Sequence, residues 1–173
     1  IAGDMVDTLS GSGNIGFNGG AADKAQYRFP AAVAISLDGT WVAVADRENS
    51  MIRRIEAPSG MVSVLAGFGE KGFVDGTAGE AKFNTPSSLA FSPDGTWLAV
   101  ADAGNHAIRK VDAATGATET IAGALPSDIG QGITGFVNGH ATDEGRLSGP
   151  KGVAFSADGE WLAVSDSGNR AVR

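Results

Sequence analysis

A threefold internal repeat constrains the fold of this chain more than any other feature of its sequence. The motif Asp-Gly-x-Trp begins at Asp38, Asp94 and Asp158, so the repeat spacing is 56 and then 64 residues. Three further sets of residues keep this spacing: Pro30, Pro86 and Pro150; Asp46, Asp102 and Asp166; Asn49, Asn105 and Asn169. A period of this length is typical of propellers and solenoids, in which each repeat forms one supersecondary unit. We therefore predict three copies of one structural unit.

The longer second interval contains an insertion before Pro150, at residues 124–134. This segment is the one place where the repeat pattern is interrupted, and loops that depart from a scaffold often carry contacts to partners. We therefore consider Ile129 a candidate interaction residue. The alternative interpretation is a surface excursion that contacts nothing.

Each unit shows short alternating apolar segments separated by turn residues, and no segment has a helical period, which predicts an all-β fold. The Asp-Gly pairs predict tight hairpins, because glycine accepts the positive φ of such turns. The expected strands are 32–36, 41–45, 51–55 and 62–66 in the first unit, 88–92, 97–101, 107–111 and 118–122 in the second, and 152–156 and 161–165 in the third. Residues 6–10 match the fourth strands. Four antiparallel strands form a propeller blade.

The second unit carries a family resemblance. Its segment Asp102-Ala-Gly-Asn105-His106-Ala107-Ile108-Arg109 resembles an NHL repeat, and the other two copies keep the Asp, Asn and Arg positions. The resemblance implies a β-propeller. It leaves the function open, because NHL-like propellers include protein-binding modules, RNA-binding domains, extracellular sensors and a few lyases.

The register of the repeats gives the expected domain organisation. We expect residues 1–10 to provide the fourth strand of a split blade, residues 11–66 and 67–122 to form two full blades, and residues 123–173 to form a third blade that lacks its fourth strand. The predicted fold class is therefore an all-β propeller with three four-stranded antiparallel blades, half of a six-bladed ring. Propellers typically contain about four to eight blades. A homodimer with strand exchange, a higher homo-oligomer or the remainder of a longer propeller would supply the others.

The candidate interaction residues lie at the expected split blade and in the long loops. Val6, Thr8 and Val172 belong to the strands at the two ends, whereas Asn18, Asp75 and Asn138 lie in or beside the Gly-Phe-x-x-Gly motifs. A phosphate cradle is one interpretation of these glycine-rich loops, but phosphate-binding loops are followed by a helix N-terminus, and none is predicted. We favour a structural role, in which the glycines permit turns and the phenylalanines pack between blades.

The repeated Asp-x-x-Asn frame and the two histidines could suggest a metal. Two oxygen ligands per loop are few for calcium, which takes six to eight, so we expect Asp and Asn to bond their own loop and the following arginine to lie over the neighbouring blade. His106 and His140 occupy different positions in the repeat and are expected to be exposed polar residues, since zinc needs further ligands. We therefore predict no metal, no cofactor and no catalytic residues.

Charge and composition disfavour some classes of binding partner. The net charge of -7 disfavours nucleic acids and anionic membranes, and no apolar run approaches the roughly 18–20 residues of a membrane span. The sequence has no cysteine, so it can form no disulfide. The compartment stays open, although the chain starts at Ile1 without an initiator methionine, which favours a secreted or extracellular protein.

The predicted function is a non-enzymatic protein-binding or assembly module that self-associates or is completed by another chain. The alternative is a metal-dependent hydrolase or lyase whose axial site needs a second chain.

Overall fold

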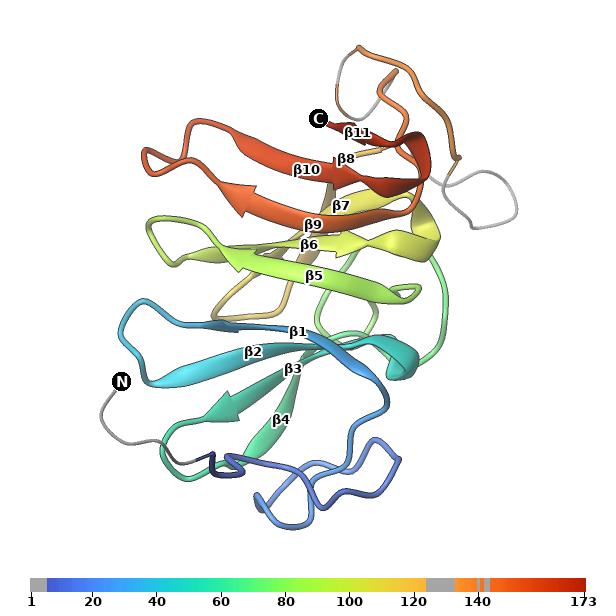
Figure 1. Cartoon of the computed structure of the whole chain (residues 1–173). Coiled ribbons are helices and arrows are strands. Elements are labelled where there is room, and N and C mark those ends of the chain that lie inside the picture. Colours follow the sequence, from blue (N-terminus) through green and yellow to red (C-terminus); the bar gives the residue numbers. More distant parts are fainter. Residues whose placement is uncertain (1–5, 124–132, 140, 142–143) are drawn as a thin grey trace.

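The computed structural model describes residues 6–123, 133–139, 141 and 144–173, and it shows three antiparallel β-sheets arranged as propeller blades (Figure 1). The first sheet has the order β1-β2-β3-β4, the second β5-β6-β7-β8, and the third β11-β10-β9. The strands are β1 (Pro30–Ile35), β2 (Trp41–Asp46), β3 (Met51–Glu56), β4 (Val62–Ala66), β5 (Pro86–Phe91), β6 (Trp97–Asp102), β7 (Ala107–Asp112), β8 (Thr118–Ala122), β9 (Pro150–Phe155), β10 (Leu162–Asp166) and β11 (Ala171–Val172). The prediction of an all-β propeller is confirmed.

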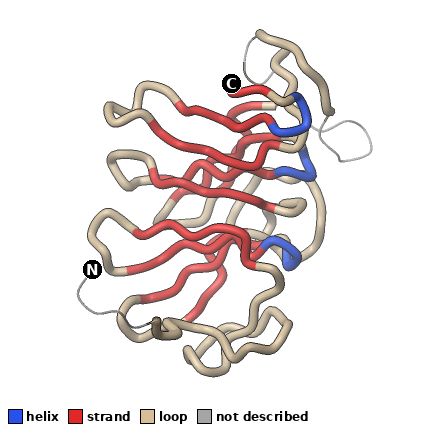
Figure 2. The backbone as a smooth tube through the Cα atoms, viewed as in Figure 1, coloured by secondary structure: helices blue, strands red, loops and turns tan. Residues whose placement is uncertain are grey.

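Within the described ranges, the helical content is one short 3-10 turn in each repeat, between the second and third strands (Figure 2). These turns are η1 (Arg47–Asn49), η2 (Ala103–Asn105) and η3 (Ser167–Asn169). Each ends on a residue with left-handed backbone, namely Ser50, His106 and Arg170. The turns bring the Asp and Asn of each repeat together, as described below.

The hairpins between the first and second strands are fixed by a local polar network. One carboxylate oxygen of Asp38 accepts hydrogen bonds from the Ser36 hydroxyl (2.7 Å), the Thr40 hydroxyl (2.8 Å) and the Thr40 backbone N–H (3.0 Å). Gly39 has a φ of +70°, and the equivalent glycines of the other two hairpins also have positive φ. The Asp-Gly turns predicted from the sequence are therefore confirmed. These bonds lower the pKa of Asp38 to about 2.

The core lies between neighbouring sheets. In β2 and β6, alternate residues starting with the tryptophan lie on one side of the sheet, which we call the tryptophan face; in the first sheet it carries Trp41, Ala43 and Ala45. In the third sheet, Trp161 directly precedes β10. It packs against the opposite face of the next sheet, which we call the phenylalanine face and which carries Leu89, Phe91 and Leu98 in the second sheet.

An aromatic pair marks each of these interfaces. The rings of Trp41 and Phe91 meet edge to face at 5.0 Å, and those of Trp97 and Phe155 do the same at 4.9 Å. The two interfaces therefore repeat the same contact, at the same positions of the repeat.

Residues 6–10 do not form a strand. They lie beside the first sheet, whereas the β11 edge of the third sheet, which pairs with no further strand among the described residues, lies at the opposite end of the arc (Figure 1). The contribution of this segment to a split blade stays a prediction.

Candidate interaction site

A buried Asp-Asn-Arg cluster ties the long loop of each repeat to its own sheet. In the second repeat, a carboxylate oxygen of Asp102 accepts hydrogen bonds from the Asn105 amide (2.7 Å) and from the Arg109 guanidinium (3.0 Å). The other oxygen accepts from the backbone N–H of Asn84, at the end of the loop (2.7 Å). Asp102 and Arg109 are fully buried. Burial raises the pKa of Asp102 to about 6, against the opposing effect of Arg109 and the two N–H donors.

The same cluster also holds the Gly-Phe-x-x-Gly motif of the loop. The Asn105 amide donates to the carbonyl oxygen of Gly72 (2.7 Å), and Arg109 donates to that of Val74 (2.7 Å) and to the Asp75 carboxylate. In the first repeat, Arg53 reaches the carbonyl oxygens of Phe17 (3.2 Å) and Asn18 (3.3 Å) in the same way.

Two details of the expectation for this frame are therefore wrong. The arginine does not lie over the neighbouring blade; it lies between the sheet and the long loop of its own repeat, because the carbonyl oxygens there satisfy its donors. Besides each other, Asp and Asn bond the backbone of the long loop, whereas we expected bonds to the backbone of the short turn that carries them. Among the loop phenylalanines, Phe73 is buried, while Phe17 and Phe136 are largely exposed.

His106 also differs from the expectation of an exposed polar side chain. It is partly buried, and its Nδ1 accepts a hydrogen bond from the backbone N–H of Gly149 (2.9 Å), which joins the second sheet to the start of the third. Burial lowers the pKa of His106. His140 lies outside the described residues. In the part of the chain that the structure describes, no group of three His, Cys, Asp or Glu side chains could hold a metal ion.

The third repeat keeps the Asp-Asn-Arg cluster, but the described residues include no fourth strand beside it. Arg173 donates to the carbonyl oxygen of Val137 (2.9 Å) and to the Asn138 side chain (2.6 Å), and its bond to Asp166 is longer, at 3.5 Å. In the first two repeats, Gly20 and Gly76 form β-bridges with the first residue of the fourth strand, Val62 and Thr118. No bridge to Gly139 is present among the described residues.

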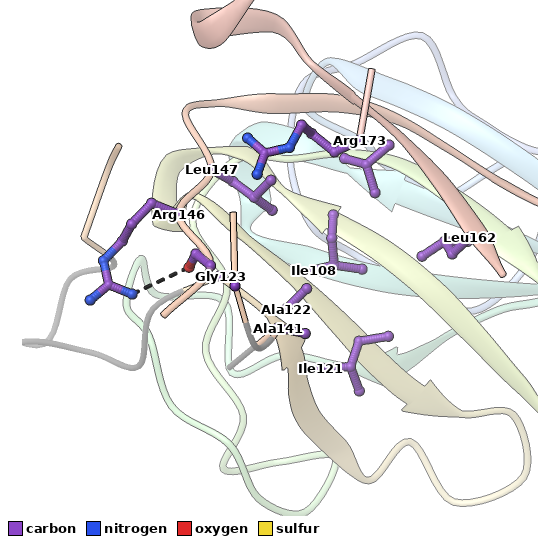
Figure 3. Close-up of a pocket in the computed structure, with 12 residues that line it drawn as sticks. Ile108, Ile121, Ala122, Gly123, Ala141, Arg146, Leu147, Leu162 and Arg173 are labelled. Carbon is purple, nitrogen blue, oxygen red and sulfur yellow. Dashed lines mark hydrogen bonds between the residues drawn. The ribbon is translucent and has the colours of Figure 1, made fainter. Parts of the chain in front are cut away.

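An apolar pocket of about 310 Å³ opens beside this cluster, between the second and third sheets (Figure 3). Ile108 and Ile121 line one wall, Leu162 lies across from them, and Leu147 and Arg173 lie at the other side (Figure 3). At the equivalent interface of the first two sheets, Phe83 and Ala81 occupy the repeat positions of Leu147 and Gly145 and are fully buried. The smaller side chains of the third repeat leave this space partly unfilled.

The structure brings only some of the candidate residues together. Asn138 and Val172 lie on either side of the third cluster, and Val172 is 79% exposed at the free edge of β11. Asp75 is engaged by Arg109 and by Thr120, so it serves the fold of its own repeat. Val6 is 100% exposed and Thr8 is exposed. The backbone of Asn18 binds Arg53, and Ile129 lies outside the described residues.

Sequence reasoning missed one set of exposed apolar residues. Trp161 is 62% exposed, although its counterpart Trp41 is 6% exposed, and Val33 and Ile35 are exposed at positions where Leu89 and Phe91 are covered. The repeat alignment contains the signal, because each of these positions is packed in at least one other copy.

No described helix is long and apolar enough to cross a membrane.

Comparisons with known proteins agree with the repeat architecture. The family model "WD domain, G-beta repeat" matches residues 81–109. NHL repeat-containing protein 2 of Homo sapiens is 30% identical over 95% of this chain and 23% of that protein. Protein SUPPRESSOR OF QUENCHING 1, chloroplastic, of Arabidopsis thaliana is 29% identical over 98% of this chain and 16% of that protein. The chain thus spans less than a quarter of these curated relatives.

Solved structures agree on the fold. An auxiliary nutrient binding protein from Bacteroides thetaiotaomicron superimposes with a TM-score of 0.68 at 21% identity, covering 81% of this chain and 35% of that one. Together, the repeat frame, the three stacked sheets and these relatives identify the chain as a run of NHL-like β-propeller blades.

Proposed function

We propose that the chain is a non-enzymatic protein-interaction module, and that the open edge of β11 binds an extended segment of a second copy, residues 6–10. The observation that carries the proposal is the edge of β11, which pairs with no further strand in the part of the chain that the structure describes and lies next to an apolar pocket. Strand addition at such an edge is a common mode of protein recognition, because backbone hydrogen bonds provide affinity and side-chain pockets provide specificity.

The backbone of β11 has groups free for this pairing. Arg173 exchanges both of its backbone hydrogen bonds with Val164 of β10 (2.8 and 2.9 Å). Because neighbouring residues of a strand point their backbone groups in opposite directions, the N–H and C=O of Val172 point away from β10. In the first two sheets, the equivalent residues Ile52 and Ile108 pair with the fourth strands at Ala66 and Ala122.

Residues 6–10 have the side chains that this position requires. Val6 and Leu9 occupy the repeat positions of Val62 and Leu65, which are both buried in the first sheet. Val62 packs with Val44 and Ile55 on the phenylalanine face of its sheet. A strand added to β11 in the same register therefore directs Val6 into the pocket of Figure 3.

A synthetic peptide of residues 4–12 tests this proposal. Fluorescence anisotropy of the labelled peptide should show saturable binding to the chain. The Val6→Asp peptide should bind at least about tenfold more weakly, since a buried charge is costly. The Asp7→Asn peptide is the matched control, because Asp7 occupies the position of the exposed Ser63, and it should bind like the original.

A second variant tests the edge itself. Val172→Pro removes one outward N–H but leaves the Arg173–Val164 pair in place, so the chain should stay folded and lose peptide binding. Equal affinity of all three peptides, or undiminished binding to Val172→Pro, would contradict strand addition.

A further inference from the structure

A small polar pocket lies where the first strands of the three sheets meet. The strands β1, β5 and β9 lie side by side, with β5 in the middle (Figure 1). The pocket has a volume of about 220 Å³ and is lined by the second residue of each of these strands and by the first residues of η1 and η2, namely Ala31, Ser87, Lys151, Arg47 and Ala103. We call it the inner basin. All three sheets contribute to it, so it requires the three stacked repeats.

The side chains of the inner basin differ between equivalent positions of the repeat. The middle sheet contributes two small residues, Ser87 and Ala103, whereas the two sheets beside it contribute the cations Lys151 and Arg47 at the same repeat positions. The small residues therefore leave space between two positively charged side chains. No acidic residue lines the basin in the described part of the chain.

Both cations are available to a ligand. Lys151 is exposed and forms no ion pair with any described residue. The Nε of Arg47 lies 3.9 Å from the Glu48 carboxylate, which also lies 3.8 Å from the Nζ of Lys71. Exposed pairs of this kind contribute little free energy, so an anion in the basin can compete for Arg47.

A hydrogen bond between two sheets fixes one wall of the inner basin. The Ser87 hydroxyl of β5 donates to the carbonyl oxygen of Pro150 in β9 (2.9 Å), and Pro150 directly precedes Lys151. The start of β9 is thereby held against the middle sheet. The hydroxyl oxygen keeps its acceptor capacity, so it can also receive a hydrogen bond from a ligand hydroxyl group.

We propose that the inner basin binds a small oxyanion, a phosphate or carboxylate group on a small molecule, between Arg47 and Lys151. Guanidinium and ammonium groups form strong charge-assisted hydrogen bonds with such oxygens. The basin is smaller than the roughly 300–1,000 Å³ of pockets for drug-sized ligands, which favours a small ligand. The proposal goes beyond the proposed function, and it does not depend on the edge of β11.

Titration of the ¹⁵N-labelled chain followed by NMR provides the first test. The probes are sodium phosphate and, separately, sodium succinate, with the ionic strength held constant by sodium chloride. We expect saturable shifts of the backbone amides of Ser87, Ala103 and Lys151 with at least one probe. Lys151→Ala and Arg47→Ala should each raise the dissociation constant about tenfold, since hydrogen bonds to charged groups contribute about 1.5–3 kcal/mol.

Lys24→Ala is the matched control for these two variants. It also removes one positive charge, but Lys24 lies in the first long loop, where it pairs with Asp23 at 3.0 Å, and it does not line the basin. The control should bind both probes like the original chain. Equal dissociation constants for Lys24→Ala and Lys151→Ala would show that only the net charge matters.

Two further variants change the inner basin in opposite directions. Ala31→Lys adds a third cation at the repeat position of Lys151 and should tighten binding about fivefold, because a further opposite charge at about 4 Å contributes about 1 kcal/mol in water. Ala103→Asp places a carboxylate between the two cations and should abolish binding. A gain of affinity in one variant cannot result from unfolding.

The outcomes also separate this proposal from strand addition. Lys151→Ala should still bind the peptide of residues 4–12, and Val172→Pro should still bind the oxyanion, so each proposal can fail alone. Saturation by phosphate alone or by succinate alone would assign the ligand group. Shifts that do not saturate with either probe, or equal affinity of Lys151→Ala and the original chain, would overturn the oxyanion site.

Discussion

At the scale of single residues, the most constrained side chains are the buried arginines that join each long loop to its sheet. Arg53 and Arg109 are fully buried, and their donors are used by a carboxylate and by loop carbonyl oxygens. A buried ion pair is weak evidence for net stability, but removing one partner leaves an uncompensated charge in the interior. The sequence shows the Asp, Asn and Arg spacing, whereas the carbonyl partners become visible only in the folded chain.

Replacing Arg109 should be far more harmful than replacing its neighbour in β7. Arg109→Ala leaves Asp102 buried without its charged partner and should lower the free energy of unfolding by about 3–5 kcal/mol. Lys110→Ala removes an exposed pair with Glu119 and should change it by less than about 1 kcal/mol. Urea denaturation of both variants measures the difference, and equal losses would show that the cluster has no special role.

His106 gives the molecule a specific dependence on pH. Its pKa is lowered by burial, so below about pH 6.5 the unfolded chain binds a proton more readily than the folded chain does. The contribution of His106 to stability is therefore present above pH 6.5 and decreases as the pH falls below it. Protonation also removes the Nδ1 acceptor of Gly149.

The test compares the original chain with His106→Asn, which tolerates the left-handed backbone at this position. Between pH 7 and 5, the original chain should lose stability relative to the variant. Asp102, with its raised pKa, contributes the opposite slope, but it does so equally in both proteins. Parallel stability curves for the two proteins would rule out His106 as the source.

At the scale of secondary structure elements, strand positions follow from local sequence, but strand pairing does not. The hairpin turns and the alternation of apolar residues predict β4 and β8 with their observed bounds. The first strands begin two residues earlier than predicted, at Pro30, Pro86 and Pro150. Proline is accepted there because it is the first residue of its strand, next to an irregularity in the pairing.

Two other strand predictions depended on a neighbour that sequence alone cannot place. Residues 6–10 have the pattern of a fourth strand but form none, since a strand needs a partner edge and they lie beside the first sheet. β10 begins at Leu162 and not at Trp161, because Trp41 and Trp97 pair with the last residues of β3 and β7, and β11 ends before the equivalent position.

Two glycines with nearly the same backbone conformation allow the stability cost of backbone strain to be distinguished from the cost of overpacking between sheets. Gly39 has a φ of +70° and Gly116 of +72°, but a Cβ on Gly39 would meet nothing within 4 Å. A Cβ on Gly116 would overlap the carbonyl oxygen of Leu65 in the neighbouring sheet. Gly39→Ala should cost about 1–2 kcal/mol from backbone strain alone.

Gly116→Ala should cost about 1–3 kcal/mol more than Gly39→Ala, the usual range for overpacking. Thermal and urea denaturation of the two variants provide the comparison. Equal losses would show that the β7–β8 turn does not pack tightly against the first sheet.

At the scale of the whole molecule, the same contact between a tryptophan face and a phenylalanine face occurs twice, once between each pair of neighbouring sheets. Trp161 on the tryptophan face of the third sheet and Ile35 on the phenylalanine face of the first sheet are exposed. The repeat period predicts the three sheets and the similar side chains at their equivalent positions. The exposure of Trp161, Val33 and Ile35 could have been predicted as well, by asking which repeat positions have no following or preceding sheet. The pocket beside β11 could not be predicted, because it depends on how the folded chain packs around Leu147 and Gly145. These residues leave open part of the space that the larger Phe83 and Ala81 fill at the equivalent interface.

Equivalent tryptophans should therefore behave differently in stability measurements. Trp97→Leu removes an edge-to-face contact with Phe155 from a packed interface and should lower the free energy of unfolding by about 1.5–3 kcal/mol. Trp161→Leu should change the stability of the monomer by less than about 0.5 kcal/mol. Denaturation at submicromolar protein concentration measures both, and a large loss for Trp161→Leu would mean that this side chain already packs within its own chain.

The buried arginine clusters also bear on how such molecules gain and lose repeats in evolution. In the first repeat, every partner of Arg53, from Phe17 to Ser63, lies within a stretch shorter than one 56-residue period. A gene duplication of one period, cut between a fourth strand and the following loop, would therefore copy the anchor together with everything it holds. Lineages could change the number of blades in single steps without having to invent new interior polar contacts.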